Sequence, residues 1–415
     1  MKKKLLIIGF VWPEPKSSAA GSRMLQLVEQ FQNQGYEIMF ASAAKMSKNT
    51  FDLSSLGIEM QTIYLNDSSF DAFITKFKPE VVLFDRFMTE EQYGWRVAKQ
   101  CPESLRILDT EDFHGLRKAR ELALKENKDV SVLHLQNDIT KREIASMYRC
   151  DLSLIISEAE IDILTTQFKI DKSLLYYLPF LLESIPIVSR IKEEINLLPT
   201  FKERQHFITI GNFLHAPNYD AVLYLKQTIW PLIRKELPKA ELHVYGAYES
   251  QKVTQLNNNK EGFLVRGFAD NVNNVMKNAK VCLASLRFGA GLKGKLIDAM
   301  QNGTPCAMSS IAAEGMFGEL EPNGFIEDKP EAFAKKAVEL YNDASLWKAN
   351  QKSCIKILNQ RFNKMDFESS FSFKITELIS NLITHRQANF VGQLMMHQTL
   401  QSTKYMSKWI EEKNN

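Results

Sequence analysis

The residues with the clearest chemical potential lie between positions 287 and 298, where the sequence reads RFGAGLKGKLID. Gly289 and Gly291 would let a ligand approach the backbone closely. The apolar spacing after them predicts a helix over 293–301, and the first turn of a helix presents free N–H groups and a partial positive charge to an anion. The segment therefore predicts a diphosphate site. A glycine turn between a strand and a helix is the plain alternative.

Charged side chains support the diphosphate interpretation. Arg287, Lys293 and Lys295 place full positive charges around the glycines. Asp298 stands about one helical turn beyond Lys295, where a carboxylate can accept hydrogen bonds from a ribose. We therefore predict that the three basic residues stabilise phosphate charge and that Asp298 binds the ribose of a nucleotide. Solvated charges on an ordinary helix are the alternative.

The same residues also fit the start of a P-loop. Residues 289–295 match the pattern G-x-x-x-x-G-K. A P-loop continues with Ser or Thr, which holds magnesium, whereas Leu296 follows here. We therefore do not interpret the segment as the nucleotide loop of an ATPase.

Short apolar runs alternate with amphipathic stretches and must position this loop. Such runs between helices indicate parallel strands buried on both faces, and repeated strand–helix units predict doubly wound α/β domains. Strands are expected at 5–10, 37–42, 58–64, 81–84, 105–108, 152–156, 173–178, 206–210, 241–245, 262–265, 281–284 and 305–309, and helices at 22–34, 70–78, 218–235 and 293–301.

The alternation is interrupted by a stretch that holds Pro186 and Pro199 among irregular charges. This composition is typical of an interdomain linker. We expect an N-terminal Rossmann-like domain over 1–180, the linker over 181–205, a C-terminal Rossmann-like domain over 206–362 and a helical segment over 363–415. Two such domains in tandem leave a cleft between them, where pockets are common.

Composition excludes several classes of protein. With 45% apolar residues in 415, the chain can build substantial cores. Lys and Arg number 52 against 49 Asp and Glu, which gives no support for a nucleic-acid binder. The five cysteines form no C-x-x-C pair, so a disulfide framework or a zinc site is not expected. No stretch approaches the ~20 apolar residues of a membrane span. A cytoplasmic protein is expected.

Several motifs together resemble the retaining glycosyltransferases of family 4, also called group 1. The matching segments are GNFLHAPN at 211–218, WP at 230–231, PKAELHVYG at 238–246, GAGLKGK at 289–295, DAM at 298–300, GTP at 303–305 and AEG at 313–315. The first half matches more loosely, through Pro13, GSR at 21–23 and GY at 35–36.

The resemblance implies a GT-B fold, in which two Rossmann-like domains face a central cleft. It implies a nucleotide-diphosphate sugar as the donor, held by the C-terminal domain, and an acceptor held mostly by the N-terminal domain. It also implies retention of the anomeric configuration and no metal or other cofactor. The sequence holds no D-x-D motif for a metal, and fixed positive charge can stabilise a leaving phosphate instead. The acceptor, whether a glycan, a lipid-linked molecule or a protein, stays open.

The chain departs from the family at two places. Ala290 stands where the first acid of the usual E-x7-E pair is expected, and Asp298 occupies the second position. Glu314, in the AEG turn, is the candidate for the missing acid beside the sugar, with an exposed loop glutamate as the alternative. Gly315 of the same turn is expected against the donor. The basic pair usual after Gly211 is absent, so the basic residues of the 287–298 segment would take its role.

Further donor contacts are expected from loops at the strand ends. Asn212, with His215 and Asn218, follows the first strand of the C-terminal domain, and Phe268 is placed to flank the base. Alternatively, the polar residues shape the loop or cap the helix, and the phenylalanine packs in the core. Gly21 begins the first helix and is expected to approach the donor, with a plain N-cap at Ser22 as the alternative.

A second dense cluster runs from Asp109 to Arg120, directly after a predicted strand. Open α/β sheets bind ligands at this edge. We predict that His114 contacts the transferring sugar and that Asp109 or Asp112 orients the acceptor hydroxyl, while Arg117 and Arg120 bind an anionic group. A helix start with acids before bases is the alternative.

The tail from 387 to 415 reads as helical with scattered apolar residues. GT-B chains often return a C-terminal helix to the first domain, so packing there is expected. Contact with a membrane surface, at the inner face of the membrane, is the alternative role for these helices.

Two other functions stay open. One is a different GT-B enzyme, either an inverting transferase, with His114 as the base, or a sugar-nucleotide epimerase. The other is a catalytically degenerate protein that binds nucleotide sugars, which the loss of the acid at Ala290 would explain.

Overall fold

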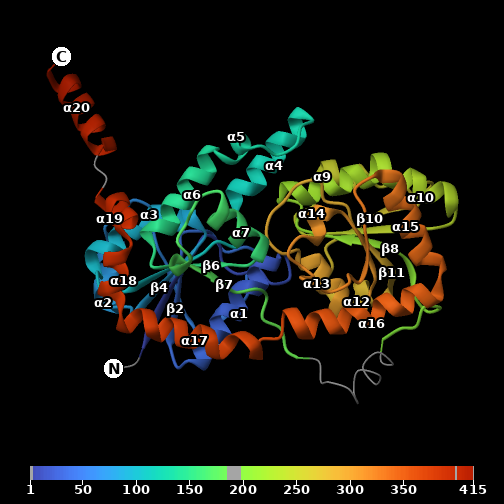
Figure 1. The fold of residues 1–415 in the computed structure, drawn as a ribbon, viewed down its shortest axis with the longest axis horizontal. Coiled ribbons are helices and arrows are strands. Elements are labelled where there is room, and N and C mark those ends of the chain that lie inside the picture. The colour runs from blue at the N-terminus through green and yellow to red at the C-terminus, as the bar shows by residue number, and fades with distance from the viewer. Residues whose placement is uncertain (1–2, 185–197, 398–399, 415) are drawn as a thin grey trace.

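The computed structural model describes residues 3–184, 198–397 and 400–414. Most of the predicted linker over 181–205 lies outside them, because residues 185–197 are not described. In Figure 1 the chain forms two α/β bodies side by side, the first built from the N-terminal half and the second from the C-terminal half.

The N-terminal body is built on a parallel sheet in the order β3-β2-β1-β4-β5-β6-β7. The strands are β1 (Lys4–Gly9), β2 (Glu37–Ser42), β3 (Glu59–Thr62), β4 (Val81–Asp85), β5 (Leu105–Asp109), β6 (Leu152–Ile155) and β7 (Leu175–Tyr177). The helices around it are α1 (Ala19–Asn33), α2 (Ser69–Phe77), α3 (Phe87–Gln100), α4 (His114–Glu126), α5 (Val132–Leu135), α6 (Asp138–Arg149) and α7 (Glu158–Thr166).

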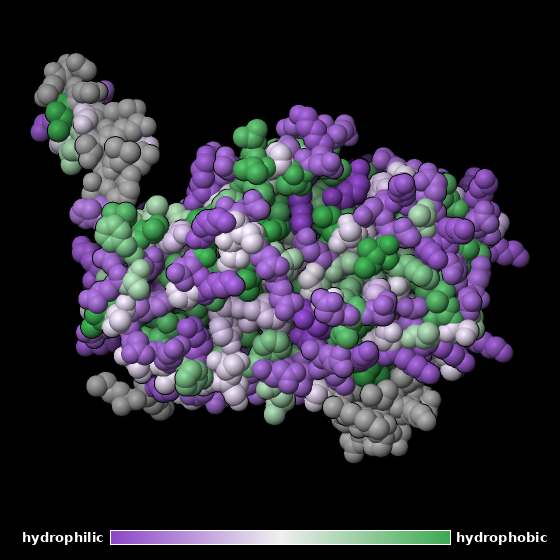
Figure 2. Space-filling model, viewed as in Figure 1, coloured by the Kyte–Doolittle hydropathy of each residue, from purple (hydrophilic) through white to green (hydrophobic). Residues whose placement is uncertain are grey.

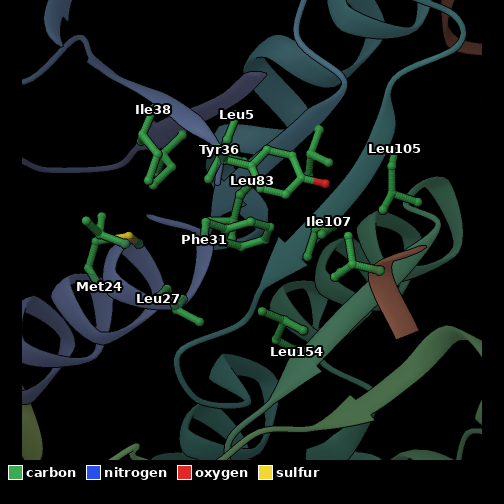
Figure 3. Close-up of a cluster of buried hydrophobic side chains, with 14 of the residues drawn as sticks. Leu5, Met24, Leu27, Phe31, Tyr36, Ile38, Leu83, Leu105, Ile107 and Leu154 are labelled. Carbon is green, nitrogen blue, oxygen red and sulfur yellow. The ribbon is translucent and has the colours of Figure 1, made fainter. Parts of the chain in front are cut away.

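Alternation along the central strand builds a core on each face of this sheet. Leu5 and Ile7 of β1 join a cluster with α1, part of which Figure 3 shows. Leu6 and Ile8 join a different cluster on the opposite face. Since successive side chains of a strand point to opposite faces, an unbroken apolar strand is what a sheet covered by helices on both sides requires.

The C-terminal body repeats this plan with a sheet in the order β10-β9-β8-β11-β12-β13. Its strands are β8 (Gln205–Ile210), β9 (Leu242–Tyr245), β10 (Phe263–Gly267), β11 (Ala279–Ala284), β12 (Cys306–Met308) and β13 (Gly324–Ile326). Its helices are α9 (Ala216–Tyr224), α10 (Trp230–Glu236), α11 (Gln251–Thr254), α12 (Val272–Asn278), α13 (Gly294–Gln301), α14 (Ser310–Ala313), α15 (Pro330–Asn342) and α16 (Ala344–Arg361).

Three local predictions need correction. The helix expected over 22–34 begins at Ala19, and Ser18 rather than Ser22 is its N-cap. The helix expected over 218–235 is α9 and α10 joined by a π-helical turn over 225–229; Pro231, which has no N–H to donate, follows that turn. The edge strand β13 is not among the predicted strands, because its three residues are too short for an alternating pattern to register.

The C-terminal helices connect the two bodies. After α16 the chain pairs with the segment that leaves the N-terminal body, where the Leu182 carbonyl accepts from Lys364 N at 2.8 Å. Helix α17 (Met365–Ser380) then packs Phe371 and Ile375 into the core of the N-terminal sheet. Helix α18 (Leu382–Ala388) follows, and its Arg386 binds the carboxylate of Asp151 at 2.7 Å.

The last two helices lie at the far end of the N-terminal body. Helix α19 (Phe390–His397) packs against α6, and α20 (Leu400–Asn414) projects away from the molecule (Figure 1). Among the helices that the structure describes, none is both long enough and apolar enough to cross a membrane.

Candidate active site between the two domains

Four helix N-termini converge where the carboxyl edges of the two sheets face each other. Helices α1 and α4 begin there in the N-terminal domain, and α9 and α13 in the C-terminal domain. A Cβ atom added to Gly294, at the start of α13, would lie 2.5 Å from Cβ of Ala19, at the start of α1. Since each N-terminus carries partial positive charge, their convergence favours an anion in the cleft.

The loop over 285–293, called the donor loop below, docks on the N-terminal domain at Gly291. This residue has a φ of +65°, and a Cβ on it would lie 2.8 Å from Cβ of Asp112. Only glycine combines the left-handed backbone with so close an approach. Its N–H donates to Oε1 of Glu160 on α7 at 2.7 Å, and the same oxygen accepts from Phe113 N at 2.8 Å. One carboxylate therefore joins the two domains.

Lys295 lies in the first turn of α13 with 9% of its surface exposed. Among the described residues its ammonium has no hydrogen-bond or ion-pair partner. Burial lowers its pKa to about 8, and Cys282 and Asp298 only partly oppose this. A buried cation that makes no ion pair or hydrogen bond with the described residues, at a helix N-terminus, is arranged to receive an anionic ligand.

Lys293, the N-cap of α13, is directed differently. Its ammonium donates to the carbonyl of Ala290 at 3.0 Å and also to that of Gly291. Burial lowers its pKa to about 8, while Glu314 opposes the shift. Lys293 therefore fixes the shape of the donor loop as well as adding charge to it.

Arg287 lies against α9. It binds Asp220 through Nε at 3.0 Å and Nη2 at 2.5 Å, and its guanidinium lies 4.8 Å from the ring centre of Tyr224. Its charge therefore already has a partner within the C-terminal domain. To make the predicted phosphate contact, Arg287 would have to leave this bidentate ion pair.

Asp298 lies close to Lys295 on α13, as the helical spacing predicts. Burial raises the pKa of this carboxyl to about 7, and Lys295 partly opposes the shift. None of the hydrogen bonds found among the described residues involves its carboxylate. The side chain is thus available to a donor group such as a ribose hydroxyl.

Glu314 and Arg120 form a bridge across the cleft. Arg120 of α4 binds both carboxylate oxygens of Glu314, at 2.6 and 2.9 Å, and donates to the carbonyl of Gly289 at 2.8 Å. Gly315 follows with a φ of +74°, and a Cβ there would lie 2.4 Å from Oγ of Ser157. The AEG turn therefore contacts the N-terminal domain, and the predicted anion ligand Arg120 is paired.

His114 begins α4 on the opposite wall. Its Nδ1 lies 3.0 Å from the carbonyl of Asp112 and 3.5 Å from a carboxylate oxygen of Glu143. Burial lowers the pKa of His114, but the carboxylates of Asp112 and Glu143 outweigh it, so the pKa is raised overall. The other ring nitrogen, Nε2, has no hydrogen-bond partner in the part of the chain that the structure describes.

His215, at the N-terminus of α9, faces this wall. Burial, with Arg117 next in effect, lowers its pKa to about 4, so the ring is neutral near pH 7. Asp112 is bound to Arg117, which holds the carboxyl pKa well below its usual range despite burial. Asp109, the other predicted acceptor ligand, is fully buried and bound to Arg23 at 2.8 Å.

Two of the remaining predicted residues have local roles. Asn212 accepts from Leu214 N at 2.9 Å and so shapes the β8–α9 loop. Gly21 is covered by the backbone of Glu14, since a Cβ on it would lie 2.4 Å from that carbonyl carbon. Phe268 is 38% exposed directly after β10. A cavity of about 330 Å³ opens at this strand end, lined by Glu249, Thr254, Asn257, Val265, Arg266 and Gly267.

Sequence reasoning misses Glu160 and Glu111. Glu160 lies within an amphipathic helix that carries no local motif, so nothing in the sequence marks it. Burial raises its pKa to about 7. Glu111 lies inside the cluster from Asp109 to Arg120 but has no predicted role. Its φ of +62° is uncommon for a residue with a side chain.

Comparisons with known proteins define the class. Residues 204–343 match the profile of the family described as Glycosyl transferases group 1, a segment that includes the donor loop and α13. No curated protein matches the chain in sequence.

Solved structures match almost the whole chain. Sucrose-phosphate synthase from Thermosynechococcus elongatus superposes with a TM-score of 0.64 at 15% identity, over 92% of this chain and 100% of that one. TarM of S. aureus gives 0.66 at 10% identity, over 90% and 100%. Anabaena HepE, in complex with UDP and glucose, gives 0.64 at 12% identity, over 91% and 100%.

These likenesses confirm the predicted GT-B fold of two Rossmann-like domains with a helical C-terminal region. Together the profile match of the C-terminal domain and the GT-B fold support an enzyme of the glycosyltransferase class.

Proposed function

We propose that the protein transfers a sugar from a nucleotide-diphosphate sugar to an acceptor hydroxyl in the cleft, with retention and without a metal. The observation that carries this proposal is Lys295, a buried ammonium in the first turn of α13 that makes no ion pair or hydrogen bond with the described residues. A diphosphate would supply the missing negative charge, and the α13 N–H groups would bind it.

A uridine nucleotide is the donor that we propose to test first. HepE was solved with UDP and with UDP-glucose, and TarM with UDP. On this chain, Asp298 would accept from the ribose hydroxyls, and Phe268 would lie beside the base.

The proposed reaction depends more on stabilising the negative charge of the leaving diphosphate than on a strong base. The bond between the anomeric carbon and the diphosphate oxygen breaks, and the acceptor oxygen bonds to that carbon. The acceptor proton passes to a phosphate oxygen on the same face. Lys295 and the α13 N-terminus would stabilise the leaving diphosphate. The bridges made by Glu160 and by Arg120 would keep water out of the closed cleft.

The test begins with a thermal-shift screen of nucleotide sugars, followed by release of nucleoside diphosphate with the best binder. Turnover should survive excess EDTA, and the anomeric configuration of the product, read by NMR, should match the donor. Inversion would replace this proposal with an inverting transferase. Binding without any product would favour a degenerate sugar-nucleotide-binding protein, and isomerised donor without transfer would indicate an epimerase.

We also propose a cytoplasmic location with peripheral membrane contact through the last two helices. All five cysteines are free thiols, as a reducing compartment requires. Apolar side chains lie at the surface over α19 (Figure 2). The large exposed ones on the two helices are Phe390, Val391, Leu394, Met395, Met396, Tyr405, Met406, Trp409 and Ile410. An interfacial helix presents such a face to lipid.

Sedimentation of the full chain with phosphatidylglycerol vesicles tests the membrane contact. Binding should be lost in the double variant Phe390→Ser and Trp409→Ser and kept in Phe373→Ser, an exposed residue of α17. No binding by the wild-type chain would reject it.

A further inference from the structure

Polar contacts join the two domains on both flanks of the cleft. The bridges of Gly291 and Glu314 leave the C-terminal sheet after β11 and β12 and end on α7 and α4, which follow β6 and β5. The opposite flank has β9 in one sheet and β1 in the other, and there Tyr248 is joined to Glu14. Neighbouring strands lie about 4.8 Å apart, so this contact leaves the sheets roughly 10 Å from the bridges.

Tyr248 lies in the loop between β9 and α11 and reaches across the cleft. Its hydroxyl lies 2.8 and 2.6 Å from the two carboxylate oxygens of Glu14, to which it donates. The hydroxyl of Ser47, in the loop after β2, donates to the same carboxylate. The carboxylate is thus anchored within its own domain and receives a cross-domain hydrogen bond from Tyr248. This pair is called the clasp below.

Glu14 is held firmly at the start of α1. It stands between Pro13 and Pro15, whose rings fix the backbone φ. Its carbonyl accepts from Ser17 N and Ser18 N at 3.0 Å each. A movement of Glu14 would therefore be transmitted to the N-terminus of α1, which faces α13 across the cleft.

The backbone of Tyr248 is strained. Its φ of +59° is uncommon for a residue with a bulky side chain, and such strain is typical of ligand clamps and switch regions. The preceding residues are fixed, because Ala247 O accepts from Phe213 N at 3.0 Å and Gly246 N donates to Gly267 O at 2.9 Å. The loop therefore has a rigid base and presents Tyr248 to the other domain.

The clasp can open at little cost. Tyr248 is 36% exposed, so water can replace its hydrogen bond to Glu14. Glu14 also borders a cavity of about 20 Å³ beside Glu111, whose lining is Val11, Pro13, Glu14, Ser18, Ala20, Gly21, Met24, Asp85, Arg86 and Glu111. Because a void offers few packing contacts, Glu14 loses little when it moves.

The start of α13 lies between the clasp and the bridges. With the clasp closed, α1 and α13 are in contact, since a Cβ on Gly294 would lie 2.5 Å from Cβ of Ala19. Lys295 follows directly and is 9% exposed. A diphosphate can reach this ammonium only after the two helix starts move apart.

We propose that Tyr248 and Glu14 form a releasable clasp that controls the passage of the nucleotide into and out of the cleft. When the clasp opens, the domains separate along the flank of β1 and β9, and the bridges on the other flank act as the pivot. The inference rests on the proposed transferase function, whose donor is the nucleotide. Both are positioning residues, because they act by moving α1 away from Lys295.

The test compares the full wild-type chain with Tyr248→Phe, which removes the hydroxyl and keeps the ring, with Glu14→Gln, which removes the charge at nearly constant size, and with the double variant. Tyr64→Phe, at a residue that is 61% exposed after β3, is the matched control. Surface plasmon resonance gives the association and dissociation rate constants of UDP. Small-angle X-ray scattering gives the radius of gyration of each chain without nucleotide.

We expect each single variant to raise both rate constants at least fivefold and to keep the dissociation constant within twofold, because a clasp that closes with and without nucleotide slows entry and exit alike. The double variant should be no faster than the faster single variant, since both residues share one interaction. The radius of gyration should increase in all three, and Tyr64→Phe should match the wild type.

Unchanged rate constants, or faster dissociation with unchanged association, would overturn the clasp as a gate. A wild-type chain that does not bind UDP would instead reject the transferase function. The scattering measurement then still decides about the clasp, which is rejected if the wild type and Tyr248→Phe have the same radius of gyration.

Discussion

The two carboxyl edges that face each other across the cleft bury ionisable groups of opposite sign. On the C-terminal edge, burial lowers the pKa of Lys293 and Lys295 to about 8. On the N-terminal edge, burial raises the pKa of Asp85 and of Glu111. In both places desolvation works against the charged form of the group.

The difference indicates a division of labour within one architecture. The C-terminal edge buries the ammonium groups of Lys293 and Lys295 at the start of α13 and is suited to a diphosphate, whereas the N-terminal edge buries the carboxyls of Asp85 and Glu111, which disfavour an anion. Since both sheets have the same topology at their centres, the strand-end residues and not the fold decide which ligand each edge receives.

The largest effect is expected from Lys295→Ala. This change removes the only full charge that we place on the leaving diphosphate, so kcat/KM for the donor should fall roughly 100-fold. Nucleoside-diphosphate release measures it, with Lys348→Ala on the exposed face of α16 as the control. Wild-type activity in a folded Lys295→Ala protein would show that the C-terminal edge does not bind the diphosphate through Lys295.

Asp298→Ala should weaken nucleoside-diphosphate binding by roughly ten- to a hundred-fold, because hydrogen bonds to a charged acceptor contribute about 1.5–3 kcal/mol. Asp298→Glu should be milder. Since burial raises the pKa of Asp298 to about 7, the ionised acceptor and thus the Asp298 contribution should grow as the pH rises from about 6 to about 8. Calorimetry with UDP and 2′-deoxy-UDP measures this. Equal affinities for wild type and Asp298→Ala would place the ribose elsewhere.

His114→Ala should lower kcat about tenfold and leave nucleoside-diphosphate affinity unchanged, because the loss of one hydrogen bond to the transferring sugar is worth roughly 1.4 kcal/mol. Steady-state kinetics and calorimetry separate the two quantities. His397→Ala, exposed on α19, controls for loss of an imidazole. Weakened nucleotide binding at constant kcat would move His114 to the donor side.

The smallest effect concerns Glu160, whose pKa burial raises to about 7 in the folded protein from an ordinary 4.5. Between these values the folded chain keeps a proton that the unfolded chain has lost, so stability falls as the pH rises from 4.5 to about 7. Glu160→Gln should flatten this dependence of Tm on pH, whereas Asp162→Asn, exposed on the same helix, should not. An unchanged slope would show that Glu160 is ionised in the folded protein.

The order of the elements follows from the sequence because it depends on local pattern. Apolar runs such as that of β1 can only be buried on both faces, and the glycines of the donor loop can only be accommodated between a strand and a helix. These are short-range constraints, and the three-residue spacing by itself puts Lys295 and Asp298 on one face of α13.

The tertiary structure alone determines which group pairs with each charged side chain. Arg287 and Arg120 look as free as Lys295 in the sequence, but Asp220 and Glu314 bind them, whereas Lys295 makes no ion pair with the described residues. The contacts of Glu160 and the cavity beside Glu111 form only when segments far apart in the chain meet at one edge of the sheet. Pairing and desolvation depend on distances between segments, and a pattern of residues along the chain does not contain those distances.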